Sequence, residues 1–287
     1  MSSNYNLISF NKEYIPSDAF RIKTTNRAFR YGDGFFESMH ANGLEVQFIN
    51  DHFERILYAA NCLDLELPEY FSLEFLKKQI SGLLSRLKLF QGARVRLSIY
   101  RSGEGFYIPE TNRADVLIEA AYLSKGFYEL NISGITIDVY KDVPKQRTAY
   151  GAIKSINAMF YVLAGNYAKK NNLNDVLLVD AQEIIVEATS SNFFAIKGNE
   201  LYTPSLELGC VHGIMRKQIL NRATNMNYII HENAILKESD LLLMDELFLT
   251  NAVVGIKYVS GFRNKRYFKR SAQKMVHALN QLAFPNS

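Results

Sequence analysis

The sequence lacks the features that mark thiol-rich, exported and membrane-spanning proteins. It contains two cysteines, Cys62 and Cys210, in 287 residues, and they form no CxxC pair. Such sparse thiols exclude a disulfide framework and favour a reduced, cytoplasmic setting. No apolar run approaches the ~20 residues that a membrane-spanning helix needs. The N-terminal segment has neither the basic nor the apolar region of a signal peptide, so we expect neither export nor membrane insertion.

An excess of charge of one sign is also missing. The 33 basic residues nearly balance the 29 acidic ones, and the net charge of +4 is too small for a dedicated nucleic-acid-binding protein. A basic cluster over residues 263–270 is interpreted as the solvated face of a closing helix that runs to Ala283. The five histidines are scattered, and no second histidine follows His231 at helical spacing, so we expect no metal site.

The composition indicates a packed globular protein, with 48% hydrophobic and 22% charged residues. At roughly 150 residues per domain, the length favours two domains. Apolar periodicity of three to four residues predicts helices, and short β-branched runs bounded by turn residues predict strands. The expected helices cover residues 72–90, 156–170 and 213–225, and the expected strands cover residues 94–100, 115–121, 135–140, 176–180, 184–187, 192–196 and 201–202.

These elements predict a mixed α/β (α+β) chain. We place an N-terminal domain at residues 1–121, a connector at 122–132 and a C-terminal domain at 133–287. The four short strands between residues 176 and 202 are interpreted as a meander of hairpins, because turn residues separate them.

Two residues are candidates for covalent chemistry and charge pairing. Lys154 has small and apolar neighbours, so partial burial would disfavour its charged form and leave an amine that can form a Schiff base. The alternative is a lysine that keeps its ammonium in water at a helix start. Glu187 ends an apolar strand, where a buried carboxylate would need a partner such as a protonated pyridine nitrogen. The alternative is an exposed glutamate at the end of a strand.

Two further features suit a phosphate group. Gly213 precedes an expected helix, whose unpaired amides and dipole favour an anion. Arg55 follows a helical pattern and offers a two-pronged guanidinium to the same anion. Glycines before helices are common, however, and Arg55 has the alternative of a surface pair with Asp51.

Taken together, the motifs resemble the class IV aminotransferase family, the fold-type IV enzymes that use pyridoxal 5′-phosphate (PLP). The resemblance spans about residues 10–262 and rests on six blocks in the family's order. These blocks are residues 27–37, 52–55, 153–157, 187–193, 213–216 and 245–251.

The resemblance implies a role for each candidate residue. Lys154 would hold PLP through a Schiff base and shuttle the proton at the substrate α-carbon, Glu187 would pair with the pyridine nitrogen, and Arg55 would bind the phosphate. Other implied cofactor-binding residues are Asn192, Gly213, the amides of Ile214 and Met215, and the side chain of Asn251 or Thr250. Tyr31 would line the site near the lysine. The family has a smaller N-terminal α/β domain, a larger C-terminal domain, PLP in the cleft between them and a homodimeric assembly.

Three activities occur in this family, and we favour aminodeoxychorismate lyase, which forms 4-aminobenzoate and pyruvate. The lyases resemble this chain at residues 213–216, at Asn251 and at Ser38, where a hydroxyl beside the lysine would assist proton transfer. The alternative is a branched-chain-like L-amino acid aminotransferase, from which the chain departs at Met215, at Met159 and at residues 36–40. Glu37, where some lyases carry threonine, weighs against the lyase.

Two other possibilities have less support. D-amino acid aminotransferases carry an Arg-x-His pair that is absent from the loop after residue 100. A non-catalytic PLP-binding protein is disfavoured because both Lys154 and Glu187 are present. The substrate is expected to be a small amino compound, and the candidates to bind its carboxylates are Arg96, Arg101 and Tyr107.

Overall fold

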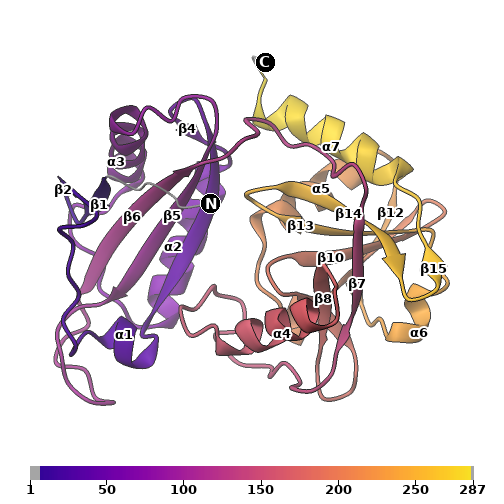
Figure 1. Cartoon of the computed structure of the whole chain (residues 1–287), viewed down its shortest axis with the longest axis horizontal. Helices are drawn as coiled ribbons and strands as arrows, with labels where there is room; N and C mark the ends of the chain where they lie inside the picture. Colours follow the sequence, from indigo (N-terminus) through magenta and orange to yellow (C-terminus); the bar gives the residue numbers. More distant parts are fainter. Residues whose placement is uncertain (1–6, 286–287) are drawn as a thin grey trace. The chain divides into compact units, whose positions relative to one another are not determined.

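The computed structural model describes residues 7–285 and divides the chain into two units (Figure 1). One unit runs to Phe127 and also contains Ile153–Ala158, and the other contains Tyr128–Ala152 and the chain from Met159 onward. The change at Phe127 falls within the expected connector, residues 122–132. The expected division into residues 1–121 and 133–287 assigns each continuous stretch to a single domain. In the structure, Ile153–Ala158 belong to the first unit although they lie within the expected second domain.

The first unit is built on a six-stranded antiparallel sheet in the order β2-β1-β6-β5-β3-β4. Its elements are β1 (Ile8–Phe10), β2 (Glu13–Ile15), α1 (Arg27–Tyr31), β3 (Gly34–Asn42), β4 (Glu45–Val46), α2 (Ile49–Cys62), α3 (Leu73–Arg86), β5 (Ala93–Arg101) and β6 (Ala114–Tyr122). The strands expected at residues 94–100 and 115–121 are confirmed as β5 and β6.

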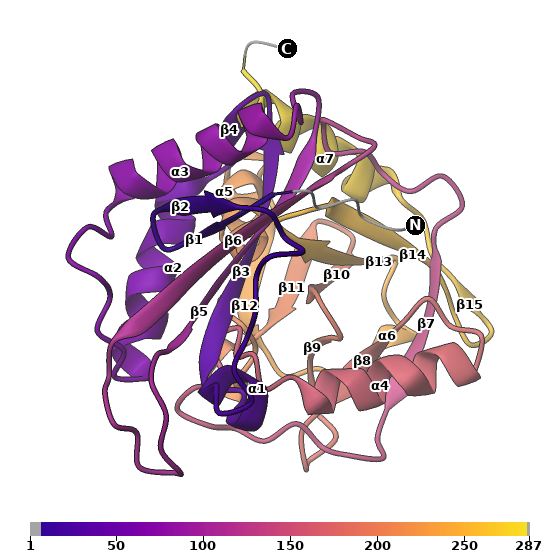
Figure 2. The same cartoon turned by 60° about the vertical axis from the view of Figure 1, so that its left-hand side comes forward.

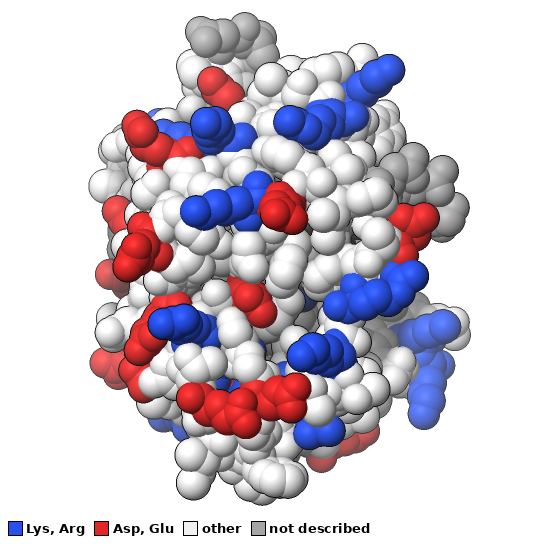
Figure 3. All heavy atoms as spheres, turned by 90° about the vertical axis from the view of Figure 1, so that its left-hand side faces the viewer, with Lys and Arg blue, Asp and Glu red and all other residues white. Residues whose placement is uncertain are grey.

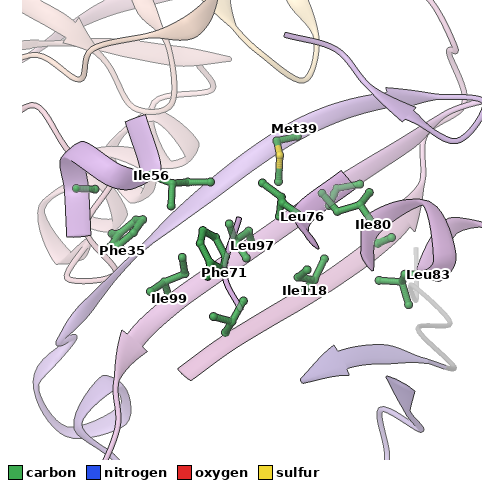
Figure 4. Close-up of a cluster of buried hydrophobic side chains, with 14 of the residues drawn as sticks. Phe35, Met39, Ile56, Phe71, Leu76, Ile80, Leu83, Leu97, Ile99 and Ile118 are labelled. Atoms are coloured by element: carbon green, nitrogen blue, oxygen red, sulfur yellow. The ribbon is translucent and has the colours of Figure 1, made fainter. Parts of the chain in front are cut away.

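Alternate residues of the long strands form the core of this unit. Phe35 and Met39 of β3 and Leu97 of β5 point to one face of the sheet, where they pack against α2 and α3 (Figure 4). Helix α3 covers most of the expected helix 72–90. It begins where the Ser72 hydroxyl accepts a hydrogen bond from the Phe75 amide (3.1 Å), which satisfies one of the free amides of the first turn.

The second unit is built on a nine-stranded sheet in which β12-β11-β10-β13-β14-β7-β8-β9 are neighbours and β15 pairs with β14. Its strands are β7 (Ile135–Tyr140), β8 (Asp175–Val179), β9 (Ile185–Ala188), β10 (Asn192–Lys197), β11 (Glu200–Pro204), β12 (Ile229–Ala234), β13 (Glu246–Asn251), β14 (Gly255–Phe262) and β15 (Lys265–Arg266). Its helices are α4 (Met159–Lys170), η1 (Leu206–Leu208), α5 (Ile214–Asn225), α6 (Glu238–Leu241) and α7 (Arg270–Ala283). Figure 2 shows α4 alongside β8, where Ala164 and Ala168 pack on Val176 and Leu178.

Three expectations for the second half of the chain are wrong in detail. The helix expected from residue 156 begins at Met159, because Ile156 instead donates its amide hydrogen bond to the Gly34 carbonyl (3.0 Å). The expected meander is two separate hairpins, β8–β9 and β10–β11, and β10 pairs with β13. The basic cluster 263–270 lies mostly on the β14–β15 hairpin, and α7 starts only at Arg270.

On the face shown in Figure 3, basic and acidic side chains are interspersed. Within residues 7–285, no helix is both long and apolar enough to cross a membrane. The same residues contain no group of three or more His, Cys, Asp or Glu side chains that could hold a metal ion.

Candidate functional site

Lys154 is fixed to the edge of β3 by backbone hydrogen bonds. Its carbonyl oxygen accepts from the Phe36 amide (2.9 Å), and the flanking Ser155 forms a β-bridge with Phe35. The Lys154 side chain is partly buried, and its Nζ lies 4.9 Å from the centre of the Phe36 ring. This amine is therefore held over an aromatic ring, where a lysine is attracted by the ring's electron density.

Ser38 and Arg96 lie on the face of the sheet that carries the Phe36 ring. Successive side chains of a strand point to opposite faces, so Phe36 and Ser38 share the face that is turned away from α2 and α3. The register pairs Ser38 with Arg96, whose guanidinium carbon lies 4.0 Å from the centre of the Phe36 ring. Lys154 and Arg96 thus contact one aromatic ring, with a hydroxyl on the same face.

The other expected residues of this unit lie at the end of α1, at the end of β5 and in the loop that follows β5. Tyr31 ends α1, and its ring centre is 5.6 Å from that of Tyr107, which is 89% exposed. Arg101 is buried, and its guanidinium makes four hydrogen bonds, to Asp33, Asn112 and the carbonyls of Leu63 and Asp64. These bonds fix the Arg101 guanidinium within the protein, and its expected contact with a substrate stays a prediction.

Arg55 lies on α2 and is paired with a buried carboxylate of β3. Its Nε donates to Glu37 Oε1 (2.7 Å) and its Nη2 to Glu37 Oε2 (2.6 Å), while His52 Nδ1 lies 2.8 Å from Glu37 Oε2. The alternative of a surface arginine is wrong, because only 9% of Arg55 is exposed. The sequence did not indicate Glu37 as the partner of Arg55, although strand alternation places it on the face that α2 covers.

The charge of Arg55 determines the ionisation of Glu37. Burial by itself raises the pKa of Glu37, but the Arg55 guanidinium and the hydrogen bonds from His52 and Arg55 outweigh burial and lower the pKa to about 2. Burial lowers the pKa of His52, against the opposing effect of its bond to Glu37. Glu37 is therefore a carboxylate at neutral pH, and it orients the guanidinium by a bidentate contact.

In the second unit, Glu187 is the centre of a buried polar network. It is 2% exposed, so the alternative of an exposed glutamate at the end of a strand is wrong. Its Oε1 accepts from Tyr161 (2.8 Å) and forms an ion pair with Lys145, and its Oε2 accepts from the amide of Val211 (3.0 Å). Sequence reasoning missed both Lys145 and Tyr161. Lys145 lies in a loop without a periodic pattern. Tyr161 stands two residues beyond position 159, where branched-chain aminotransferases, by the resemblance, usually carry a tyrosine.

Cys210 adjoins this network but is not a nucleophile. Burial, and then the charge of Glu187, raise the pKa of the Cys210 thiol to about 11, so the thiolate is scarce at neutral pH. Its sulfur instead lies 3.6 Å from the Ser205 carbonyl oxygen, to which it donates.

The start of α5 and the end of β13 form the part of this unit that suits an anion. Gly213 precedes α5 with no side-chain cap, and a Cβ at this position would lie 1.8 Å from Asn192 Oδ1, so only glycine fits. Thr250 pairs with Asn192 in the register of β10 and β13. The Thr250 hydroxyl oxygen is buried and has no hydrogen-bond partner in the described chain. The expected helix 213–225 is thus confirmed, and it begins beside an orphaned hydroxyl.

Asn251, the other residue that the resemblance implied for the phosphate, is held by hydrogen bonds within the protein. Its amide nitrogen donates to Ser191 Oγ (3.1 Å) and to the Ser190 carbonyl (3.3 Å), and its Oδ1 accepts from the amides of Val253 and Val254 (3.1 Å each). Both ends of the side chain therefore hold the turn after β13. Of the two alternatives for a phosphate-binding side chain, the geometry favours Thr250.

Comparison with known proteins identifies the family. The family model of the class IV amino-transferases matches residues 34–262, which is most of the chain. The chain belongs to the class IV aminotransferase family. PLP is the cofactor of this family and hence of this chain.

The relatives of this class IV aminotransferase have several activities. The chain is 23% identical over 238 residues to an aminodeoxychorismate lyase of Vibrio harveyi, a match that covers 82% of this chain and 85% of the relative. It is 26% identical over 245 residues to a D-alanine aminotransferase of Staphylococcus aureus, covering 83% and 84% of the two chains. The branched-chain amino acid aminotransferase of Escherichia coli has the same fold, with a TM-score of 0.86 at 21% identity over 99% of this chain and 96% of that one.

The residues of this class IV aminotransferase fit PLP. The phosphate requires hydrogen-bond donors, which the orphaned hydroxyl of Thr250 and the uncapped start of α5 would supply. The pyridine nitrogen requires a carboxylate, which the buried side chain of Glu187, in contact with Lys145, would supply. The aldehyde requires an amine, which Lys154 of the first unit would supply.

The pKa of Glu37 predicts a pH-dependent stability. Because the folded-state pKa of about 2 lies below the ordinary value of 4.5, Glu37 stabilises the fold above pH 4.5, and this stability is lost as the pH falls from 4.5 to 2. We expect this group to contribute roughly 3 kcal/mol to the loss. The Glu37→Gln variant should lack that part of the pH dependence in urea unfolding. Glu45→Gln, which neutralises an exposed glutamate of the same unit, is the control, and equal pH dependence of wild type and Glu37→Gln would contradict the assignment.

Thr250→Val tests the phosphate contact. Valine keeps the shape and removes a buried hydroxyl that has no protein partner, so the PLP-free protein should be as stable as wild type or more stable. The dissociation constant of PLP should rise about tenfold or more, since a hydrogen bond to a charged group contributes about 1.5–3 kcal/mol.

Thr203→Val is the matched control for Thr250→Val. The Thr203 hydroxyl is buried in the same unit and donates to the Phe193 carbonyl (2.8 Å). Its loss should lower the free energy of unfolding and leave the PLP affinity unchanged. Equilibrium dialysis and urea unfolding measure both quantities, and an unchanged PLP affinity in Thr250→Val would show that this hydroxyl does not bind the phosphate.

Proposed function

We propose that this class IV aminotransferase-family protein is an aminodeoxychorismate lyase that forms 4-aminobenzoate and pyruvate. In this proposal Lys154 carries PLP and moves the proton at the substrate carbon that bears the amino group. Glu187 pairs with the ring nitrogen. Arg55, Thr250 and the first amides of α5, those of Ile214 and Met215, bind the phosphate. When bound, PLP supplies an electron-poor ring that accepts the electron pair left by the departing proton.

The observation that carries the lyase proposal is the polar face of β3 and β5. Lys154 and Arg96 both contact the Phe36 ring, and Ser38 shares that face. A hydroxyl beside the amine can assist proton transfer, and a guanidinium on the same face can bind a substrate carboxylate as a bidentate donor. Tyr31, at the end of α1, and Tyr107, in the loop after β5, are proposed to line this site.

The reaction requires no oxidant. The C–H bond at the amino-bearing carbon breaks, with Lys154 Nζ as the proton acceptor. The C–O bond at the neighbouring carbon then breaks, and the leaving group takes the electron pair and a proton to become pyruvate. Loss of these groups leaves the aromatic ring of 4-aminobenzoate.

The second candidate is a branched-chain-like L-amino acid aminotransferase. Its support is Glu37, which pairs with Arg55 and stands where some lyases carry threonine. Against it, Met159 occupies the expected tyrosine position and is 64% exposed.

We also propose that the protein is a homodimer. Three successive apolar side chains, Phe106, Tyr107 and Ile108, are 80%, 89% and 85% exposed, which is typical of residues that a partner covers. Light scattering of the purified protein should give twice the mass of 32.8 kDa. A monomeric mass would contradict the proposal.

A single-turnover assay tests the function. PLP-loaded protein is mixed with aminodeoxychorismate or with L-leucine while the cofactor absorbance and pyruvate are followed. We expect pyruvate from aminodeoxychorismate and return of the starting spectrum. Conversion of the cofactor to its pyridoxamine form by leucine, without pyruvate from the other substrate, would establish the aminotransferase instead.

Borohydride reduction of the same sample tests the role of Lys154. Reduction fixes the cofactor to the lysine that holds it, and tryptic mapping separates Lys154 from Lys145 because Arg147 lies between them. We expect the label on Lys154, and we expect Lys154→Ala to lose both the label and nearly all turnover. A label elsewhere would overturn the assignment.

A further inference from the structure

Lys145 is a buried lysine that the proposed function leaves without a role. Its side chain is 7% exposed, and its backbone amide donates to the Val179 carbonyl (2.8 Å), which fixes the loop after β7 to β8. Its Nζ forms an ion pair with Glu187 Oε1 and donates to Tyr161 Oη (3.0 Å). Burying two charges costs several kcal/mol per ion unless they are paired, so each of these two residues requires the other.

The carboxylate of Glu187 has one acceptor position that its three donors do not use. An ionised carboxylate offers about four acceptor positions, two on each oxygen. Lys145 and Tyr161 occupy those of Oε1, and the amide of Val211 occupies one of those on Oε2. The remaining position on Oε2 suits a single N–H group.

Tyr161 contributes a hydrogen bond to this network but no charge. Burial, and then the charge of Glu187, raise the pKa of Tyr161 far above its ordinary value of 10.0, so the phenol stays protonated and neutral. Among residues 7–285, Lys145 is the cation that forms an ion pair with Glu187. The charge that Glu187 presents to any further donor is therefore set by Lys145.

We propose that Lys145 is a positioning residue for the ring nitrogen of PLP. Lys145 and this nitrogen would both pair with the carboxylate of Glu187, and the positive charge of Lys145 would lower the pH at which the nitrogen loses its proton. This inference rests on the proposed function, which pairs Glu187 with that nitrogen. A cation that pairs with a carboxylate is stabilised less when a second cation pairs with the same carboxylate, because the two cations repel each other. The ring nitrogen then loses its proton at a lower pH than it would beside Glu187 alone.

The experiment measures the protonation of the ring nitrogen directly. Protein is loaded with PLP that carries nitrogen-15 in the ring, and the nitrogen resonance is followed by NMR from pH 6 to pH 9. We expect the wild-type resonance to move between its protonated and unprotonated positions in this range. In Lys145→Met the midpoint should rise by about one pH unit or more, since a neighbouring charge shifts a titration by ~1–3 units.

Two further variants separate charge from structure. Lys145→Arg retains the cation and should keep the midpoint near that of wild type. Lys141→Met removes a lysine of the same unit whose side chain is 41% exposed and pairs with Glu183 and Glu238, and it should leave the midpoint unchanged. A purely structural role for Lys145 would lower the unfolding temperature of Lys145→Met without moving the midpoint, and that result would overturn the inference.

The remaining outcomes are also decisive. If Lys145→Met does not fold, the wild-type titration decides, because a ring nitrogen that stays protonated throughout pH 6–9 contradicts the inference. A protein that takes up no PLP, or that carries it away from Lys154 after borohydride reduction, overturns the proposed function and this inference together. PLP on Lys154 with equal midpoints in wild type and Lys145→Met overturns the inference alone.

Discussion

A buried carboxylate must be paired, and the pairing of Glu187 is the constraint on which the second unit's site depends. Three donors from separate segments meet on this side chain: Lys145 after β7, Tyr161 on α4 and the amide of Val211 before α5. Because an unpaired buried charge is strongly destabilising, these three segments are held in place by the same residue that would receive the cofactor's ring nitrogen. Stability and the proposed function thus depend on one carboxylate.

The first unit meets the same constraint on the covered face of its sheet. Glu37 is buried there, and Arg55 and His52 on α2 satisfy it. The alternation of β3 then sends the neighbouring Phe36 and Ser38 to the other face, where Lys154 lies over the Phe36 ring. The ion pair that orients Arg55 and the amine of Lys154 therefore lie on opposite faces of one strand.

Much of the fold could be predicted from local patterns, and the parts that failed depend on long-range pairing. The strands over residues 135–140 and 192–196 and the helices over residues 72–90 and 213–225 follow from periodicity and capping, which are local properties. The helix expected from residue 156 begins later because residues 154–156 pair with β3, more than one hundred residues away. The motif spacing likewise singled out Lys154, Glu187 and Arg55 but could not reveal Glu37 or Lys145 as their neighbours.

By itself, the sequence determined the family, the cofactor and the candidate lysine, because six short motifs in one order are a linear property of the chain. Only the tertiary structure decided which charges meet. Glu37 and Arg55 are 18 residues apart, and Lys145 and Glu187 are 42 apart. At these separations, no helix turn or hairpin turn brings the two residues of either pair together. A charged side chain that is buried in the protein interior requires a partner of opposite charge. Which residue becomes that partner depends on the tertiary fold.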